Sequence, residues 1–146
     1  MPKVAAAYCI HDDVEFFPAS VKSLLRSLAP DQIFAFVSRR TWSGEEGDVE
    51  KTVQIAHDLG LNVELGNWDS EIDHRKAIHE KLLNDGFDYV ITIDSDEVLS
   101  PELLSSLLRI AESDLADIVR VTHDTYWHSH AYRIRPRERL ALAGSP

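Results

Sequence analysis

The chain has 146 residues, 44% of them hydrophobic and 27% charged, with a formal net charge of −10 at pH 7. This length is enough for one domain, residues 1–146, with its own hydrophobic core, and the acidic charge argues against non-specific binding to nucleic acid or anionic membranes. The single cysteine, Cys9, excludes an internal disulfide. Neither a signal peptide nor a transmembrane segment is recognisable, so we expect a soluble, cytoplasmic protein.

Stretches typical of strands alternate with stretches typical of helices along the first 112 residues. The predicted strands are short apolar runs at 4–10, 33–37, 62–65 and 89–93. The predicted helices carry apolar residues at helical spacing and span about 17–28, 49–59, 74–84 and 101–111. Ser100-Pro101-Glu102 is a typical helix start, with a capping side chain, a proline in the first turn and an acid. This alternation predicts an α/β domain with a mostly parallel sheet flanked by helices.

Residues 113–146 follow this core as a C-terminal strand and a basic tail. The β-branched run at 118–122 predicts a further strand, and 132–135 predicts a strand with a polar face. From Arg120 onward five arginines and two acids give a net charge of +3, so residues 1–119 carry about −13. The tail and the core therefore have opposite charge.

The strand predicted at 89–93 ends abruptly in three acids, Asp94, Asp96 and Glu97. Carboxylates are rarely buried in a strand without a partner, so we expect these acids at the carboxyl edge of the sheet, where open α/β sheets bind ligands. Successive strand residues point to opposite faces, so we expect Asp94 and Asp96 to share a face while Ser95 turns away. Close carboxylates repel each other unless a cation lies between them, and hard oxygen ligands suit Mg²⁺ or Mn²⁺. The pattern thus predicts Asp94 and Asp96 as metal ligands, and its alternative is a polar turn before the next helix.

The order of elements, together with Arg75 near the start of the third helix, resembles the nucleotide-binding half of a family 2 glycosyltransferase of the Rossmann-like GT-A fold. In that family a Gly-Asp-Tyr-like turn leads a hydrophobic strand into an Asp-x-Asp motif, and a Leu-Ser-Pro-Glu helix start commonly follows. The matching segments here are Gly86-Phe87-Asp88-Tyr89, Asp94-Ser95-Asp96 and Leu99-Ser100-Pro101-Glu102. The resemblance covers residues 3–112.

The resemblance implies a metal-dependent glycosyltransferase that takes a UDP-sugar or GDP-sugar and transfers the sugar to an acceptor hydroxyl. Asp94 and Asp96 would hold Mn²⁺ or Mg²⁺, and Arg75 would help position the donor. A cation in the first turn of a helix opposes the helix dipole, which hints at a bound anion near Arg75, although a solvated surface charge is the alternative. The implied nucleotide-sugar contacts are Cys9, Ile10, His11, Arg75 and Asp94.

Two departures from the family pattern accompany this resemblance. The family usually has an acid after the second strand that holds uracil, where this chain reads Val37-Ser38-Arg39-Arg40. The second departure is length, because only 34 residues follow Glu112 where the family normally has an acceptor-binding half that contains its catalytic base. The catalytic residue is therefore unknown.

Two other functions stay open. One is a non-catalytic or truncated nucleotide-sugar-binding module. The other is a HAD-type phosphatase, whose opening motif is imitated at 93–98, but that fold needs a downstream lysine and none follows Lys81.

Three further groups of residues each have two interpretations. Histidines near the C-terminus are either a source of a third metal ligand or a polar edge segment: His123, His128 and His130. Tail arginines bind either the donor diphosphate or the acidic body of this or a neighbouring subunit: Arg133, Arg135, Arg137 and Arg139. Trp42 and Trp68, in predicted loops, either stack on a base or sugar or cover the core. An uncovered sheet edge also favours pairing with a second copy, as a homodimer.

Overall fold

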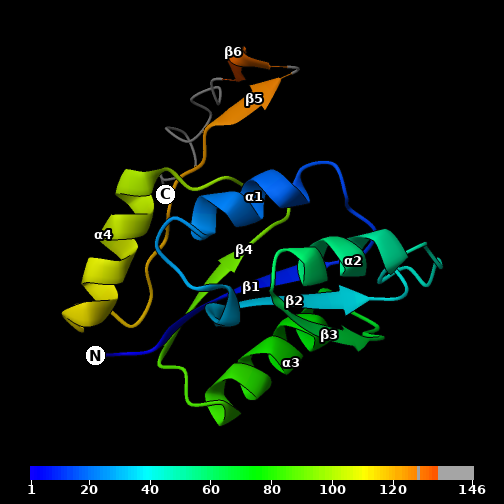
Figure 1. Cartoon of the computed structure of the whole chain (residues 1–146), viewed down its shortest axis with the longest axis horizontal. Coiled ribbons are helices and arrows are strands. Elements are labelled where there is room, and N and C mark those ends of the chain that lie inside the picture. The colour runs from blue at the N-terminus through cyan, green and yellow to red at the C-terminus, as the bar shows by residue number, and fades with distance from the viewer. Residues whose placement is uncertain (128, 135–146) are drawn as a thin grey trace, which may run out of the picture.

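The computed structural model describes residues 1–127 and 129–134, and gives only the backbone of residues 125, 127 and 129–134. Helices cover both faces of a central sheet (Figure 1). The elements in chain order are β1 (Val4–Ile10), α1 (Phe17–Leu24), the short 3-10 helix η1 (Pro30–Gln32), β2 (Ile33–Ser38), α2 (Glu50–Asp58), β3 (Asn62–Gly66), α3 (Glu71–Asn84), β4 (Tyr89–Ile93), α4 (Pro101–Glu112), β5 (Thr125–Trp127) and β6 (Ser129–Ile134).

Strands β1 to β4 form one parallel sheet in the order β3-β2-β1-β4. The two central strands are buried along almost their whole length, and Tyr8 of β1 lies opposite both Ala35 of β2 and Ile93 of β4. The prediction of a small α/β domain with a parallel sheet flanked by helices is confirmed. Because the four strands are parallel, their carboxyl ends all reach the same edge of the sheet, and this edge collects the loops that follow them.

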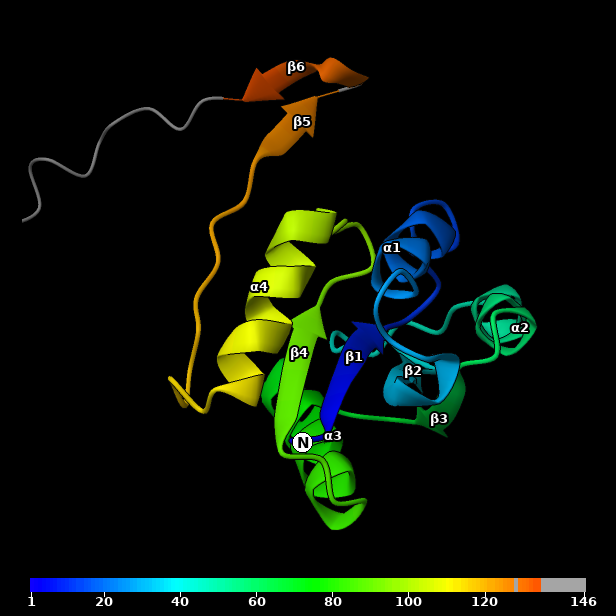
Figure 2. The same ribbon diagram turned by 60° about the vertical axis from the view of Figure 1, so that its left-hand side comes forward.

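The alternation of side chains along β1 sends its residues into two separate apolar layers. Tyr8 and Ile10 pack in the larger layer, among side chains of α1, α2 and α4. Ala5 and Ala7 face the other side, where they pack with Ile78 and other side chains of α3. Among the residues that the structure describes, three helices therefore cover one face of the sheet and α3 alone covers the other (Figure 2).

The cap of α4 is as predicted, whereas α3 begins earlier than predicted. Ser100 Oγ accepts a hydrogen bond from Leu103 N at 3.1 Å, which satisfies one of the free N–H groups of α4. In α3 the cap is Ser70, which accepts from Asp73 N, and the helix starts at Glu71 rather than at about residue 74. Two acids in the first turn of α3 complement the helix dipole and explain the earlier start.

Three predictions near the helix ends and the C-terminus need correction. The first helix ends at Leu24, and residue 28 is buried beyond it. Residues 118–122 are not a strand: they are irregular and exposed, and no strand among the described residues pairs with them. The strand predicted at 132–135 is the end of β6, which pairs antiparallel with β5 in a hairpin that stands clear of the main sheet (Figures 1 and 2). Arg135 lies outside the described residues.

Within the described residues, the helices are all too short or too polar to cross a lipid bilayer.

Candidate functional site

The acids after β4 form a closed turn rather than an extension of the strand. Glu97 N donates to Asp94 O at 3.0 Å, and Glu97 Oε2 accepts from Asp94 N at 2.9 Å. The strand ends at Ile93, so strand alternation does not determine how Asp94 and Asp96 are oriented, and that part of the sequence argument was wrong. Both aspartates are exposed at the carboxyl edge, as predicted. Glu97 holds the turn and leaves the two aspartates facing solvent.

Arg75 of α3 reaches the same edge and faces Asp94. Its Nη2 lies 3.8 Å from Asp94 Oδ1, while its Nε donates to Glu71 Oε1 at 2.8 Å. Since α3 begins at Glu71, Arg75 is in the second turn, and the proposed conflict with the helix dipole is absent. The guanidinium is instead fixed by Glu71 one turn earlier, with about a third of its side chain exposed.

The end of β1 places its three predicted contact residues in different environments. The Cys9 side chain is half-buried on the α3 side of the sheet, where burial raises the pKa of the thiol to about 11, the Arg75 charge lowers it and Asp94 raises it. Cys9, Arg75 and Asp94 thus share one neighbourhood, and the thiol is protonated at neutral pH. The Ile10 side chain lies in the core, 4% exposed, so only its backbone can reach a ligand.

His11 joins the end of β1 to the loop that follows β2. Its Nδ1 lies 2.6 Å from Ser38 O, so Nδ1–H donates to that carbonyl, and its Nε2 lies 3.9 Å from Asp12 Oδ2. Gly47 of the same loop packs directly on this ring, because a Cβ on Gly47 would lie 2.3 Å from His11 Nε2. The loop of residues 39–48 therefore lies against the end of β1.

Side-chain contacts also tie the loops at this edge to one another. Ser95 Oγ donates to Asp13 Oδ2, which links the acidic turn to the β1–α1 loop. His123 Nδ1 lies 2.9 Å from Glu97 Oε1, so the segment after α4 reaches the acidic turn as well. Of the three C-terminal histidines, His123 is thus at the site, His128 lies outside the described residues, and only the backbone of His130 is described.

Trp42 and Trp68, which were predicted in loops at this edge, pack around a buried histidine, His74, that was not predicted. His74 is 1% exposed, stacks on Trp68 with ring centroids 4.0 Å apart, and meets Trp42 edge-on at 6.2 Å. Its Nε2 lies 2.8 Å from Phe36 O, and its Nδ1 has no hydrogen-bond partner among the residues that the structure describes. A helical spacing of four from His74 to Ile78 is the signal that could have revealed its buried position. Trp68 therefore covers core atoms, while Trp42 remains 45% exposed beside it.

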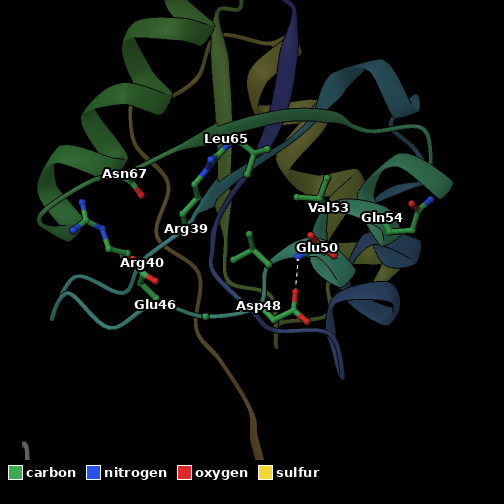
Figure 3. A pocket seen from close by; sticks show the side chains of 11 residues that line it. Arg39, Arg40, Glu46, Asp48, Glu50, Val53, Gln54, Leu65 and Asn67 are labelled. Carbon is green, nitrogen blue, oxygen red and sulfur yellow. Dashed lines mark hydrogen bonds between the residues drawn. The ribbon is translucent and has the colours of Figure 1, made fainter.

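A polar pocket of about 880 Å³ lies beyond the ends of β2 and β3, next to the start of α2 (Figure 3). Arg39, Leu65 and Asp48 line this pocket. The side chain of Asp48 also accepts a hydrogen bond from Glu50 N at 3.1 Å. Ser38, which precedes Arg39, is 2% exposed and donates to Arg40 O. Arg39 is thus the first side chain after β2 that a ligand in this pocket can contact.

The carboxylate oxygens at the acidic turn suit a cation whose remaining ligands come from outside the protein. Among the residues the structure describes, no three His, Cys, Asp or Glu side chains converge as a metal-binding group. Mg²⁺ often takes only one or two carboxylates from the protein and completes its shell with phosphate oxygens and water. The exposed oxygens of Asp94 and Asp96 fit that type of site and do not fit a closed structural metal site.

Comparisons with known proteins do not identify a family for this chain. It matches no protein-family model, no curated protein and no solved structure.

Proposed function

We propose that this chain is a metal-dependent glycosyltransferase of the family 2 type, which binds a nucleotide-diphosphate-sugar at the carboxyl edge of its sheet and transfers the sugar to an acceptor hydroxyl. The observation that carries this proposal is the position of Arg75, 3.8 Å from Asp94 at the start of an exposed acidic turn. The Arg75 guanidinium can bind the diphosphate of the donor, and the Asp94 and Asp96 carboxylates can bind a cation. All three groups lie at the edge at which parallel α/β sheets bind ligands.

In this proposal each group has a defined task. Asp94 and Asp96 hold Mn²⁺ or Mg²⁺, and the bound ion neutralises the charge that develops on the departing diphosphate. Arg75, fixed by Glu71, positions the donor. Cys9 lines the site as a neutral thiol, because its raised pKa of about 11 makes it a poor nucleophile at neutral pH. His11 and the loop of residues 39–48, which packs against it, form the side of the site nearest β2.

A thermal-shift panel tests the donor class. UDP-, GDP-, CMP- and dTDP-sugars are added with and without Mn²⁺, and the melting temperature is recorded. A ligand at one hundred times its Kd stabilises the folded state by about 2.7 kcal/mol, which raises the melting temperature by several degrees. We expect a rise that requires both the metal and one class of nucleotide-sugar. No rise with any combination would contradict the proposal.

Asp96→Ala is expected to abolish the metal-dependent part of this rise. The matched control is Asp31→Ala, which removes an exposed carboxylate at the opposite edge of the sheet, before β2.

Turnover then separates the enzyme from its alternatives. Hydrolysis of the donor that is lost in Asp96→Ala supports the enzyme, whereas tight binding without turnover supports a binding module. Release of inorganic phosphate from monoesters would instead support a phosphatase.

A further inference from the structure

The polar pocket beside α2 is lined by side chains of opposite charge that do not pair with one another. Arg39 and Glu46 both line it, and both are exposed. Among the residues that the structure describes, neither the Arg39 guanidinium nor the Glu46 carboxylate has a salt-bridge partner. The hydrogen-bond donors of one and the acceptors of the other are therefore both available to a ligand.

Backbone contacts hold these two residues in place. Arg39 N donates to Gly66 O at 3.0 Å, which extends the pairing of β2 with β3 by one residue. Arg40 and Glu46 then form an antiparallel bridge, so the chain turns back on itself between them. Because the backbone at both positions is already fixed, a ligand that binds here does not have to order it, and binding loses less entropy.

Apolar side chains supply the rest of the pocket. Leu65 of β3 is 44% exposed and lies beside Arg39 (Figure 3), and Val49 and Val53 line the same pocket. The volume of about 880 Å³ falls in the range of about 300–1,000 Å³ that is common for small-molecule sites. Such a pocket suits a flat ring, whose face packs on the apolar side chains and whose polar rim meets Arg39 and Glu46.

The pocket also adjoins the site at the acidic turn. Gly47 lines the pocket and packs on His11 at the end of β1, and β1 lies between β2 and β4 in the sheet. The ends of β2 and β4 are thus two strand spacings apart, about 10 Å. A nucleoside diphosphate whose diphosphate lies at Arg75 and Asp94 is long enough to place its base in the pocket.

We propose that this pocket binds guanine, so that the donor is a GDP-sugar; this inference rests on the proposed function. Guanine presents two acceptors, O6 and N7, on one edge, and a guanidinium donates to both at once. Its adjacent edge presents two donors, N1–H and the 2-amino group, which a carboxylate accepts. Arg39 accordingly binds O6 and N7, and Glu46 binds the two donors.

The other common bases match this pair of side chains less well. Uracil has a single N–H between two carbonyl oxygens, so it offers no pair of adjacent acceptors to Arg39. Adenine places an amino donor beside its acceptor N7, where Arg39 has only donors to give. Cytosine has two adjacent acceptors but only its amino group for Glu46, which makes it the nearest competitor.

Isothermal titration calorimetry of the full chain with Mn²⁺ compares GDP, UDP, ADP and CDP. We expect the Kd of GDP to be at least tenfold lower than that of each of the other three. Arg39→Gln should weaken GDP binding at least tenfold and leave UDP binding unchanged. The matched control is Arg26→Gln, which makes the same change at an exposed position after α1, at the opposite edge of the sheet, and should bind GDP normally.

Two analogues test the contacts atom by atom. 7-Deaza-GDP lacks N7, and inosine diphosphate lacks the 2-amino group. Both should bind the unmodified chain at least threefold more weakly than GDP does. In Arg39→Gln, GDP and 7-deaza-GDP should bind equally, and in Glu46→Ala, GDP and inosine diphosphate should bind equally, because each variant has already lost the partner of the missing atom.

The outcomes separate this inference from the proposed function. Metal-dependent binding in which UDP, ADP or CDP equals or exceeds GDP would overturn the guanine assignment and leave the glycosyltransferase proposal standing. The same holds for a discrimination between GDP and 7-deaza-GDP that persists in Arg39→Gln. Failure of all four nucleotides to bind would overturn both proposals. Selective GDP binding without any transfer or hydrolysis of a GDP-sugar would support the guanine pocket and contradict only the enzyme.

Discussion

His74 is the most buried of the histidines whose side chains the structure describes, at 1% exposed. Burial lowers its pKa, its hydrogen bond to Phe36 O raises it, and the nearby Arg75 charge lowers it, with a net downward shift. A histidine of the unfolded chain has a pKa of about 6.5, so on acidification the unfolded state takes up this proton first. The free energy of unfolding is therefore unaffected by this group above about pH 6.5 and falls below it.

This linkage predicts the effect of His74→Phe on stability. The variant keeps a ring against Trp68 and removes the titration, so its stability should fall less between pH 7 and pH 5 than that of the unmodified chain. The difference is at most about 1.4 kcal/mol for each pH unit. Urea unfolding at several pH values measures it, with His57→Phe on exposed α2 as the control. Equal pH dependence in His74→Phe and the unmodified chain would show that this account of His74 is wrong.

At the scale of elements, the cap of α4 is a local feature with a predictable energy. Ser100→Ala removes the acceptor for Leu103 N and should lower the free energy of unfolding by about 0.5–2 kcal/mol. Ser105→Ala is the matched control, because it makes the same change in the exposed middle of the same helix, where alanine is the better helix former. Urea unfolding compares the two. A loss in Ser105→Ala as large as that in Ser100→Ala would rule out the capping explanation.

The elements that could be predicted from sequence are those specified by adjacent residues. The apolar runs of β1 and β4, and the Ser100-Pro101 start of α4, have the predicted bounds because burial and capping depend on local patterns. The strand predicted at 118–122 failed because strand propensity needs a partner edge, which adjacent residues do not reveal. At the site, the position of the acids was predicted, whereas the turn that Glu97 closes and the buried stack on His74 depend on contacts across loops.

Across the whole molecule, four parallel strands bring their following loops to one edge, and long-range contacts then connect those loops. Ser95 meets Asp13 across 82 residues, and His11 meets Ser38 across 27. The acidic turn is therefore held by neighbours from several loops while its own aspartates stay exposed. Such an arrangement suits a ligand that brings its own cation, because the protein need supply only part of the coordination shell.

The central claim is that Asp94 and Asp96 bind a divalent cation together with a nucleotide diphosphate. Electron paramagnetic resonance of Mn²⁺ measures this directly, because the signal of free hydrated Mn²⁺ decreases when the ion binds. We predict weak Mn²⁺ binding to the chain alone, at least tenfold tighter binding with the matching nucleoside diphosphate after correction for the Mn²⁺ that the nucleotide binds by itself, and loss of this gain in Asp96→Asn. Equal Mn²⁺ binding with and without nucleotide, or an unchanged gain in Asp96→Asn, would contradict the account.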